Sequence, residues 1–295
     1  MRASAWVLCA VLVAGVPGTG HASPGPDRVT ILYDAFGRRA GLERDWGFAA
    51  LVEFNGQRIL FDTGNNAEIF ERNVRALGLD LGRLDYVVVS HRHGDHTSGL
   101  NYLLTVNPGV RIYAPREGFG VFGNVVPYAF VRRDSSLSSD QRYYGGAIPD
   151  SLASGTPWPQ ANFVWVNGTR SIGRGVAVVA TVSDRPGTLE LTELSLVLET
   201  PKGTVVLVGC SHPGIEKIME AARAVSAHPH LIIGGLHLVA TSDTEIERVA
   251  QALHQRFGLD GIAPGHCTGE PAFAVLRRVF ARGYRYAGLG ETIPL

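Results

Sequence analysis

Short apolar runs alternate with amphipathic stretches along most of the chain, and this pattern predicts a mixed α/β fold. Apolar runs of about four to eight residues between turn-forming residues are typical of buried strands. We expect strands at residues 28–33, 49–54, 58–61, 85–90, 111–114, 194–200, 204–208, 231–234 and 261–263. Asn55-Gly56 and Lys202-Gly203 each separate two of these strands. Both pairs predict hairpins, and Asn-Gly in particular favours a tight hairpin turn.

Apolar residues at helical spacing predict helices at residues 69–77, 97–106, 213–226, 243–257 and 270–282. Asn65 or Asn66 is expected to cap the first helix and Asp243 the fourth, because such side chains accept hydrogen bonds from free N–H groups at a helix start. The order of strand, hairpin, helix and strand occurs twice along the chain. This repetition indicates an internal duplication built around one core.

Residues 116–170 interrupt this order and are rich in Gly, Pro, Ser and aromatic residues. So long an irregular stretch in a compact domain is usually either functional or disordered. Its many aromatic residues argue against disorder. We therefore predict an irregular insertion that forms a lid or pocket wall over the functional site, with a passive surface insertion as the alternative.

The first 22 residues predict a cleavable secretory signal peptide, which would leave a mature domain of residues 23–295. Arg2 supplies a positive start, and the apolar stretch 5–16 is too short to span a bilayer comfortably. We expect a periplasmic or secreted protein with no stable membrane anchor after cleavage; an uncleaved anchor is the alternative. The formal net charge is zero and there is no basic stretch, so no nucleic-acid-binding surface is evident. The oligomeric state stays open.

A cluster of ligand-type side chains directly follows the apolar run 86–90: His91, His93, Asp95 and His96. Alternating residues of an extended segment face the same side, so His91 and His93 can face one point. Gly94 allows the backbone to turn, so the next two side chains can face a second point. Clustered imidazoles and carboxylates are costly to bury without partners. Both suit zinc, and histidine also suits iron. The alternative is a histidine-rich surface loop.

Four more polar residues follow predicted strands: Asp62, His212, His237 and His266. Strand ends are where α/β folds place their chemistry. His212 can complete a three-histidine site with His91 and His93. His237 follows paired glycines, which allow a close backbone approach, and it can be a ligand, a proton donor or a substrate contact. Each of the four can instead be structural, as a turn-capping Asp62 would be.

Cys9 lies in the predicted signal peptide, so Cys210 and Cys267 are the cysteines of the mature chain. Both adjoin candidate ligands. An exported protein could pair them in a disulfide. We expect two separate thiols instead, acting either as ligands or as residues behind the ligands.

Five motifs together resemble the metallo-β-lactamase superfamily, and within it the branch that contains the dihydropterin ribofuranosylaminobenzene phosphate synthases. They are Asp-Thr-Gly at 62–64, His-x-His-x-Asp-His at 91–96, Gly-Cys-Ser-His-Pro-Gly at 209–214, Gly-Gly-Leu-His at 234–237 and Pro-Gly-His-Cys-Thr-Gly at 264–269. The resemblance implies a four-layer αββα sandwich built from two similar halves. It also implies that His91 and His93 bind one metal and that Asp95, His96 and His266 bind or frame a second. Asp62 would then orient residues 91–96, which we call the metal loop.

One departure from the family pattern concerns the ligand shared by the two metals. Typical members carry a bridging Asp at the strand end where this chain has Gly209-Cys210. The departure weakens the expectation of a two-metal centre. Asp184, Glu190 or Glu193 could replace the missing carboxylate, and nothing in the sequence selects among them.

These observations favour an exported, metal-dependent hydrolase that uses metal-activated water on a small molecule. The bond would be of the ester type: a phosphodiester, a lactone or a thioester, with a β-lactam less favoured. We expect Zn²⁺, one or two per chain, with Mn²⁺ or Fe as alternatives. Asp95 would orient or deprotonate the water, and His237 would donate a proton. The alternative from another class is a catalytically silent ligand-binding protein on the same scaffold.

Overall fold

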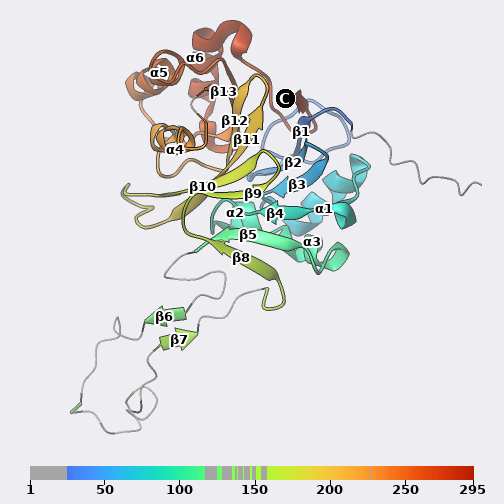
Figure 1. Cartoon of the computed structure of the whole chain (residues 1–295), viewed down its shortest axis with the longest axis vertical. Helices are drawn as coiled ribbons and strands as arrows, with labels where there is room; N and C mark the ends of the chain where they lie inside the picture. The colour runs from blue at the N-terminus through green and yellow to red at the C-terminus, as the bar shows by residue number, and fades with distance from the viewer. Residues whose placement is uncertain are drawn as a thin grey trace, which may run out of the picture.

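Two β-sheets face each other, and helices cover their outer faces (Figure 1). The computed structural model describes residues 25–116, 125–127, 135–136, 138, 142, 147, 151–153, 158–226 and 228–295. The predicted signal peptide and most of the predicted lid lie outside the described residues. Within the described part, no helix is both long enough and apolar enough to cross a membrane.

The first sheet has the strand order β15-β1-β2-β3-β4-β5-β8. Its strands are β1 (Arg28–Tyr33), β2 (Ala49–Phe54), β3 (Gln57–Phe61), β4 (Tyr86–Val88), β5 (Arg111–Pro115), β8 (Asn162–Val166) and β15 (Thr292–Pro294). Helices α1 (Ala67–Ala76), α2 (Gly94–Thr97) and α3 (Leu100–Val106) belong to this half. A separate ribbon pairs β6 (Val125–Pro127) with β7 (Ser151–Ala153).

The second sheet has the order β14-β13-β12-β11-β10-β9. Its strands are β9 (Arg170–Gly173), β10 (Val176–Val182), β11 (Thr192–Thr200), β12 (Gly203–Val208), β13 (Pro229–Gly235) and β14 (Gly261–Gly265). Its outer face is covered by α4 (Ile215–Ala222), α5 (Asp243–Gln251) and α6 (Glu270–Phe280).

Three hydrophobic clusters separate the four layers. Leu196 and Leu198 of β11 pack in the cluster between the sheets, whereas Val197 packs in the cluster under α4, α5 and α6. The third cluster joins the first sheet to α1 and α3 and includes Phe70 and Leu103. This division follows from the two-residue period of a strand, which sends successive side chains to opposite faces. The four-layer αββα sandwich is therefore confirmed.

The two halves repeat one strand pattern. β2 and β3 are antiparallel, and β3, β4 and β5 are parallel. In the same way β11 and β12 are antiparallel, and β12, β13 and β14 are parallel. Parallel strands end at the same edge of a sheet, so the loops after β3 and β4 come together in one sheet and those after β12, β13 and β14 in the other.

Several predicted elements differ from the observed ones. Residues 116–170 are not irregular throughout, because β8 lies within them and pairs in parallel with β5. The predicted helix 97–106 is split into α2 and α3 near Gly99, where a Cβ atom would lie 2.0 Å from the Thr63 carbonyl oxygen. Ser242, not Asp243, caps α5 by accepting a hydrogen bond from the Glu245 N–H. Strands β9, β10 and β15 were not predicted at all.

Asn73 of α1 fixes the loop that follows β1, and its loss should destabilise the fold. The buried amide donates to the Leu32 and Glu43 carbonyl oxygens at 3.3 and 2.9 Å and accepts from the Glu43 N–H at 2.8 Å. Asn73→Ala leaves these groups unpaired and should lower the free energy of unfolding by about 2 kcal/mol. The matched control is Arg72→Ala, which removes an exposed ion pair to Glu43 and should cost under about 1 kcal/mol. Urea unfolding measures both, and equal losses would contradict the assignment.

Candidate metal centre

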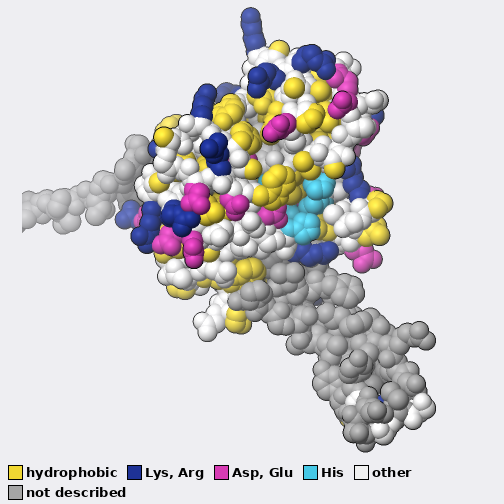
Figure 2. Space-filling model, turned by 180° about the vertical axis from the view of Figure 1, so that it is seen from behind, with side chains coloured by type: hydrophobic (Ala, Val, Ile, Leu, Met, Phe, Trp, Pro, Cys, Tyr) yellow, Lys and Arg dark blue, Asp and Glu magenta, His cyan; other side chains and the backbone are white. Residues whose placement is uncertain are grey.

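Side chains from five strand ends meet at one edge of the sandwich. Figure 2 shows histidine side chains gathered in one patch on the surface, beside hydrophobic side chains. The residues that follow the strands are Asp62 after β3, His91 to His96 after β4, His212 after β12, His237 after β13 and His266 after β14. The structure therefore brings these strand-end residues together at one edge.

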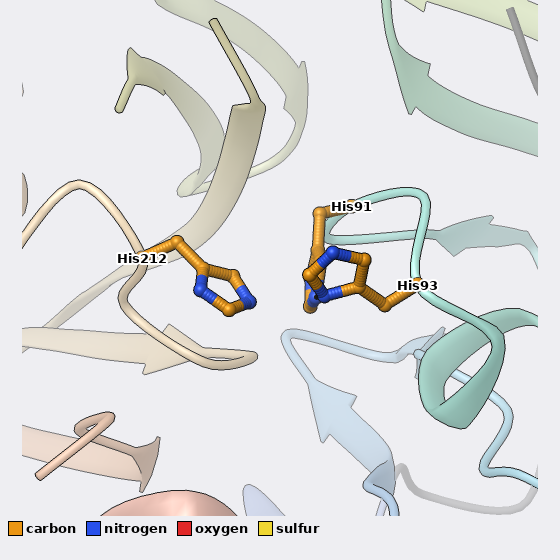
Figure 3. A group of neighbouring side chains, drawn as sticks. All are labelled: His91, His93 and His212. Carbon is orange, nitrogen blue, oxygen red and sulfur yellow. Dashed lines mark hydrogen bonds between the residues drawn. The ribbon is translucent and has the colours of Figure 1, made fainter. Parts of the chain in front are cut away.

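His91, His93 and His212 form a first group. Their rings point toward one another (Figure 3), and one nitrogen from each lies within 4.8 Å of the others. The closest pair is His91 Nε2 and His93 Nδ1, at 3.1 Å. His212 approaches from the opposite sheet, with its ring 4.8 Å from that of His91 and 4.7 Å from that of His93.

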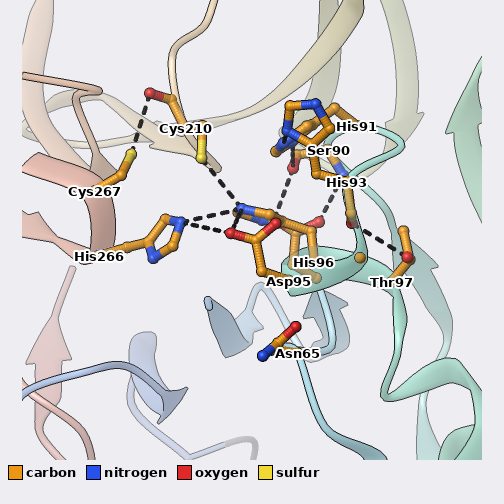
Figure 4. A network of polar contacts seen from close by, with 12 residues as sticks. Asn65, Ser90, His91, His93, Asp95, His96, Thr97, Cys210, His266 and Cys267 are labelled. Carbon is orange, nitrogen blue, oxygen red and sulfur yellow. Dashed lines mark hydrogen bonds and ion pairs between the residues drawn. The ribbon is translucent and has the colours of Figure 1, made fainter. Parts of the chain in front are cut away.

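Asp95, His96 and His266 form a second group next to the first (Figure 4). His96 Nε2 lies 3.3 Å from His266 Nε2. The Asp95 carboxylate lies 3.4 Å from His266 Nε2 and 3.8 Å from His96 Nε2. The rings of His91 and His96 are 4.2 Å apart, so the two groups adjoin.

Asp62 fixes the orientation of the metal loop from behind. Its carboxylate accepts the Ser90 N–H at 2.6 Å, the Ser90 hydroxyl at 2.7 Å and His96 Nδ1 at 2.7 Å. Ser90 Oγ in turn lies 2.8 Å from His91 Nδ1. Because this chain of bonds places a proton on Nδ1 of both histidines, it is their Nε2 atoms that face the site.

Glu193 of β11 has a similar role for the turn that carries His212. Its fully buried carboxylate accepts the N–H groups of Cys210, Ser211 and His212 at 2.9, 2.7 and 2.8 Å. Glu193 thus lies behind the turn and takes no position among the ligand-type side chains. The available signal was an acid directly before a predicted apolar strand, since a buried charge requires partners.

Asp184 does not replace the missing carboxylate either. It pairs with Lys217 on the surface at 3.0 Å.

Asp34 and Trp46 belong to the site and were not predicted. Asp34 is fully buried after β1 and accepts the His266 N–H at 2.9 Å. The partly exposed Trp46 lies with its ring 5.0 Å from the His266 ring. Asp34 also ends an apolar strand with a carboxylate, and that signal could have identified it.

Cys210 and Cys267 are separate buried thiols. Cys210 Sγ lies 3.2 Å from His96 Nε2, whereas Cys267 Sγ donates to the Cys210 carbonyl oxygen at 3.6 Å. His237 groups with both thiols, and its ring lies 4.3 Å from that of His212. His237 therefore stands beside the first group and outside it.

Comparison with known proteins agrees with this geometry. The family model described as the metallo-β-lactamase superfamily matches residues 47–253. The chain belongs to this superfamily. It is 27% identical to 7,8-dihydropterin-6-methyl-4-(β-D-ribofuranosyl)-aminobenzene-5'-phosphate synthase of Methanocaldococcus jannaschii, over 83% of this chain and 88% of that protein. The crystal structure of Tm1679, a metal-dependent hydrolase of the β-lactamase superfamily, superposes with a TM-score of 0.67 at 28% identity, covering 91% of this chain and 99% of that one. A shorter match, 30% identical, joins 27% of this chain to 28% of ribonuclease Z of Clostridium botulinum.

The metallo-β-lactamase fold implies divalent metal binding, and the residues present fit such a cation. Among the described residues, neither ring nitrogen of His212 has a hydrogen-bond partner although both are buried. Buried nitrogens without a partner are costly unless something binds them. Imidazole nitrogens and a carboxylate are donors that zinc accepts.

Four residues around the site adopt left-handed backbone conformations that side chains usually avoid: Asp62, Ser211, His237 and His266. Such conformations cost about 1–3 kcal/mol each in unfavourable cases and gather at functional sites. Here each one turns the chain at the end of a strand and directs a side chain to the sheet edge.

The charge states differ between the two groups. Burial, with the surrounding imidazoles, lowers the pKa of His91 well below its usual range and that of His212 to about 3. Burial also lowers the pKa of His96, but the Asp62 carboxylate outweighs it and raises the value to about 9. Burial raises the pKa of Asp95, yet the His266 and His96 rings bring it below its usual value.

Metal binding at the second group should therefore depend more steeply on pH than binding at the first. At pH 7 His96 holds a proton that a cation must displace, whereas His91 and His212 are already neutral. Below pH 9 the affinity of the second group should fall about tenfold more per pH unit than that of the first. Competition titrations of Zn²⁺ against a chromophoric chelator at pH 6, 7 and 8 measure both slopes, and equal slopes would contradict the assignment.

Proposed function

We propose that the protein is a metal-dependent hydrolase that cleaves an ester-type bond, with a phosphodiester as the first candidate. The observation that carries the proposal is the pair of adjoining groups, each with its ligand atoms within 4.8 Å of one another. Two cations about 3.5–4 Å apart are typical of centres that displace a leaving oxygen from phosphorus. The relatives named as a ribonuclease and as the synthase of a 5'-phosphate support a phosphate-containing substrate.

A bound divalent cation supplies Lewis acidity and activates water at neutral pH. Zn²⁺ suits the donor set better than Mn²⁺ or Fe, because imidazole and thiol predominate over carboxylate. Asp95 stays ionised at every physiological pH and is therefore a poor base. Its part is to accept a hydrogen bond from the attacking water and orient it.

We assign to His237 the protonation of the leaving group. Its contact with the Cys267 thiol raises its pKa above the usual value, so more of it is protonated near neutral pH. Its ring stands beside His212, at the margin of the first group. A protonated imidazole in that position can donate to an oxygen that leaves the substrate.

We also propose that residues 1–22 direct export and that the substrate is a small molecule of the periplasm or the medium. The positive start, the short apolar stretch and the small residues before Ser23 support this.

Removing one ligand-type residue from each group should lower activity and metal content while the protein still folds. His93→Ala and His266→Ala should each lower kcat/KM on bis(p-nitrophenyl) phosphate by at least about a hundredfold, because even residues behind the ligands typically cost 10–100-fold. Each should also bind less metal while its thermal unfolding stays cooperative. The control is His228→Ala, an exposed histidine that pairs with Asp260 and should keep full activity.

Turnover of p-nitrophenyl acetate, a thioester, a homoserine lactone and a β-lactam, compared with that of the phosphodiester, shows which type of bond the protein cleaves. Full turnover together with full metal content in His93→Ala or in His266→Ala would contradict the proposal. A fully metal-loaded wild type that turns over none of these substrates would identify a silent binding protein instead.

A further inference from the structure

The Cys210 thiol lies between the two groups of ligand-type side chains. Its sulfur is 3.2 Å from His96 Nε2, which belongs to the second group. It also lies within 4.8 Å of the ligand nitrogen of His91, which belongs to the first group. Figure 4 shows Cys210 directed at His96 from the side of the opposite sheet.

The backbone holds the thiol in this position. The Cys210 N–H is bound by Glu193 Oε1 at 2.9 Å. The preceding residue must be glycine, because a Cβ atom on Gly209 would lie 2.2 Å from Ser90 Oγ. The end of β12 can therefore approach the metal loop closely, and the side chain that follows enters the space between the groups.

Cys267 is placed differently, although it is also buried. Its thiol faces the Cys210 carbonyl oxygen and groups with His237 and Cys210. It contacts the site from behind the turn, and its hydrogen bond is one that a serine hydroxyl can also make. Cys267 therefore serves as a matched control for a buried thiol next to the site.

We propose that Cys210 is the ligand shared by two bound cations, as a bridging thiolate at the strand end where the superfamily pattern has an aspartate. The inference rests on the proposed function, since it requires both cation positions. Binding breaks the S–H bond, releases the proton to solvent and forms two metal–sulfur bonds. The thiolate keeps the single negative charge of the carboxylate but binds through one atom. It also makes the site selective for zinc or cobalt over manganese or magnesium, which prefer oxygen.

Cobalt substitution tests the bridge by spectroscopy and stoichiometry, without an activity assay. The wild type loaded with Co²⁺ should bind two ions per chain and show a sulfur-to-cobalt charge-transfer band in the near ultraviolet. Cys210→Ser should lose the band and weaken binding of one ion by at least about tenfold. Cys267→Ser should keep both the band and the two ions. Cys210→Asp should restore two ions without the band, which shows that the variant folds.

Four results would overturn the inference. The band could persist in Cys210→Ser with two ions bound, or disappear in Cys267→Ser alone, which would assign the ligand thiol to the Cys267 and His237 group. Two ions without any band in the wild type would reject the bridging thiolate and leave the hydrolase proposal standing. No cobalt binding by the wild type would overturn both.

Discussion

Buried carboxylates that accept hydrogen bonds from backbone N–H groups hold the whole site in place. Asp62 binds the metal loop through Ser90, Glu193 binds the turn before His212, and Asp34 binds the backbone of His266. A buried acceptor left without donors costs about 1–3 kcal/mol or more. Each carboxylate therefore favours one conformation of the loop it binds. These hydrogen bonds offset the cost of the left-handed backbone positions at Asp62, Ser211 and His266.

The duplicated architecture explains why these loops meet. Each half places an antiparallel hairpin before its parallel strands, so each sheet contributes a set of strand ends to one edge of the sandwich. Glycines allow the two sets to approach. A Cβ atom on Gly209 would lie 2.2 Å from Ser90 Oγ, so a larger residue there would push the end of β12 away from the loop that follows β4. The first group of histidines then draws on both sheets, and so does the second.

Much of the fold and of the candidate site could be predicted from the local sequence. Strands β1 and β2 have the predicted bounds, because apolar runs with clear turn signals define them. The positions of the metal loop and of the strand-end histidines were also predicted. The motif His-x-His-x-Asp-His marks the loop, and the tendency of α/β folds to place polar site residues at strand ends marks the histidines. Strand β8 was missed, since its sheet partner among the described residues is β5, far away in the sequence. The tasks of Asp34 and Glu193 were missed for the same reason: a carboxylate does not reveal which distant N–H groups it will bind.

Anomalous X-ray diffraction from zinc-loaded crystals would show whether two cations occupy positions set by these loops. Data collected on both sides of the zinc absorption edge locate each ion without reference to activity. One peak should lie among His91, His93 and His212. A second peak should lie among Asp95, His96 and His266. A single peak, or peaks away from these side chains, would contradict this assignment.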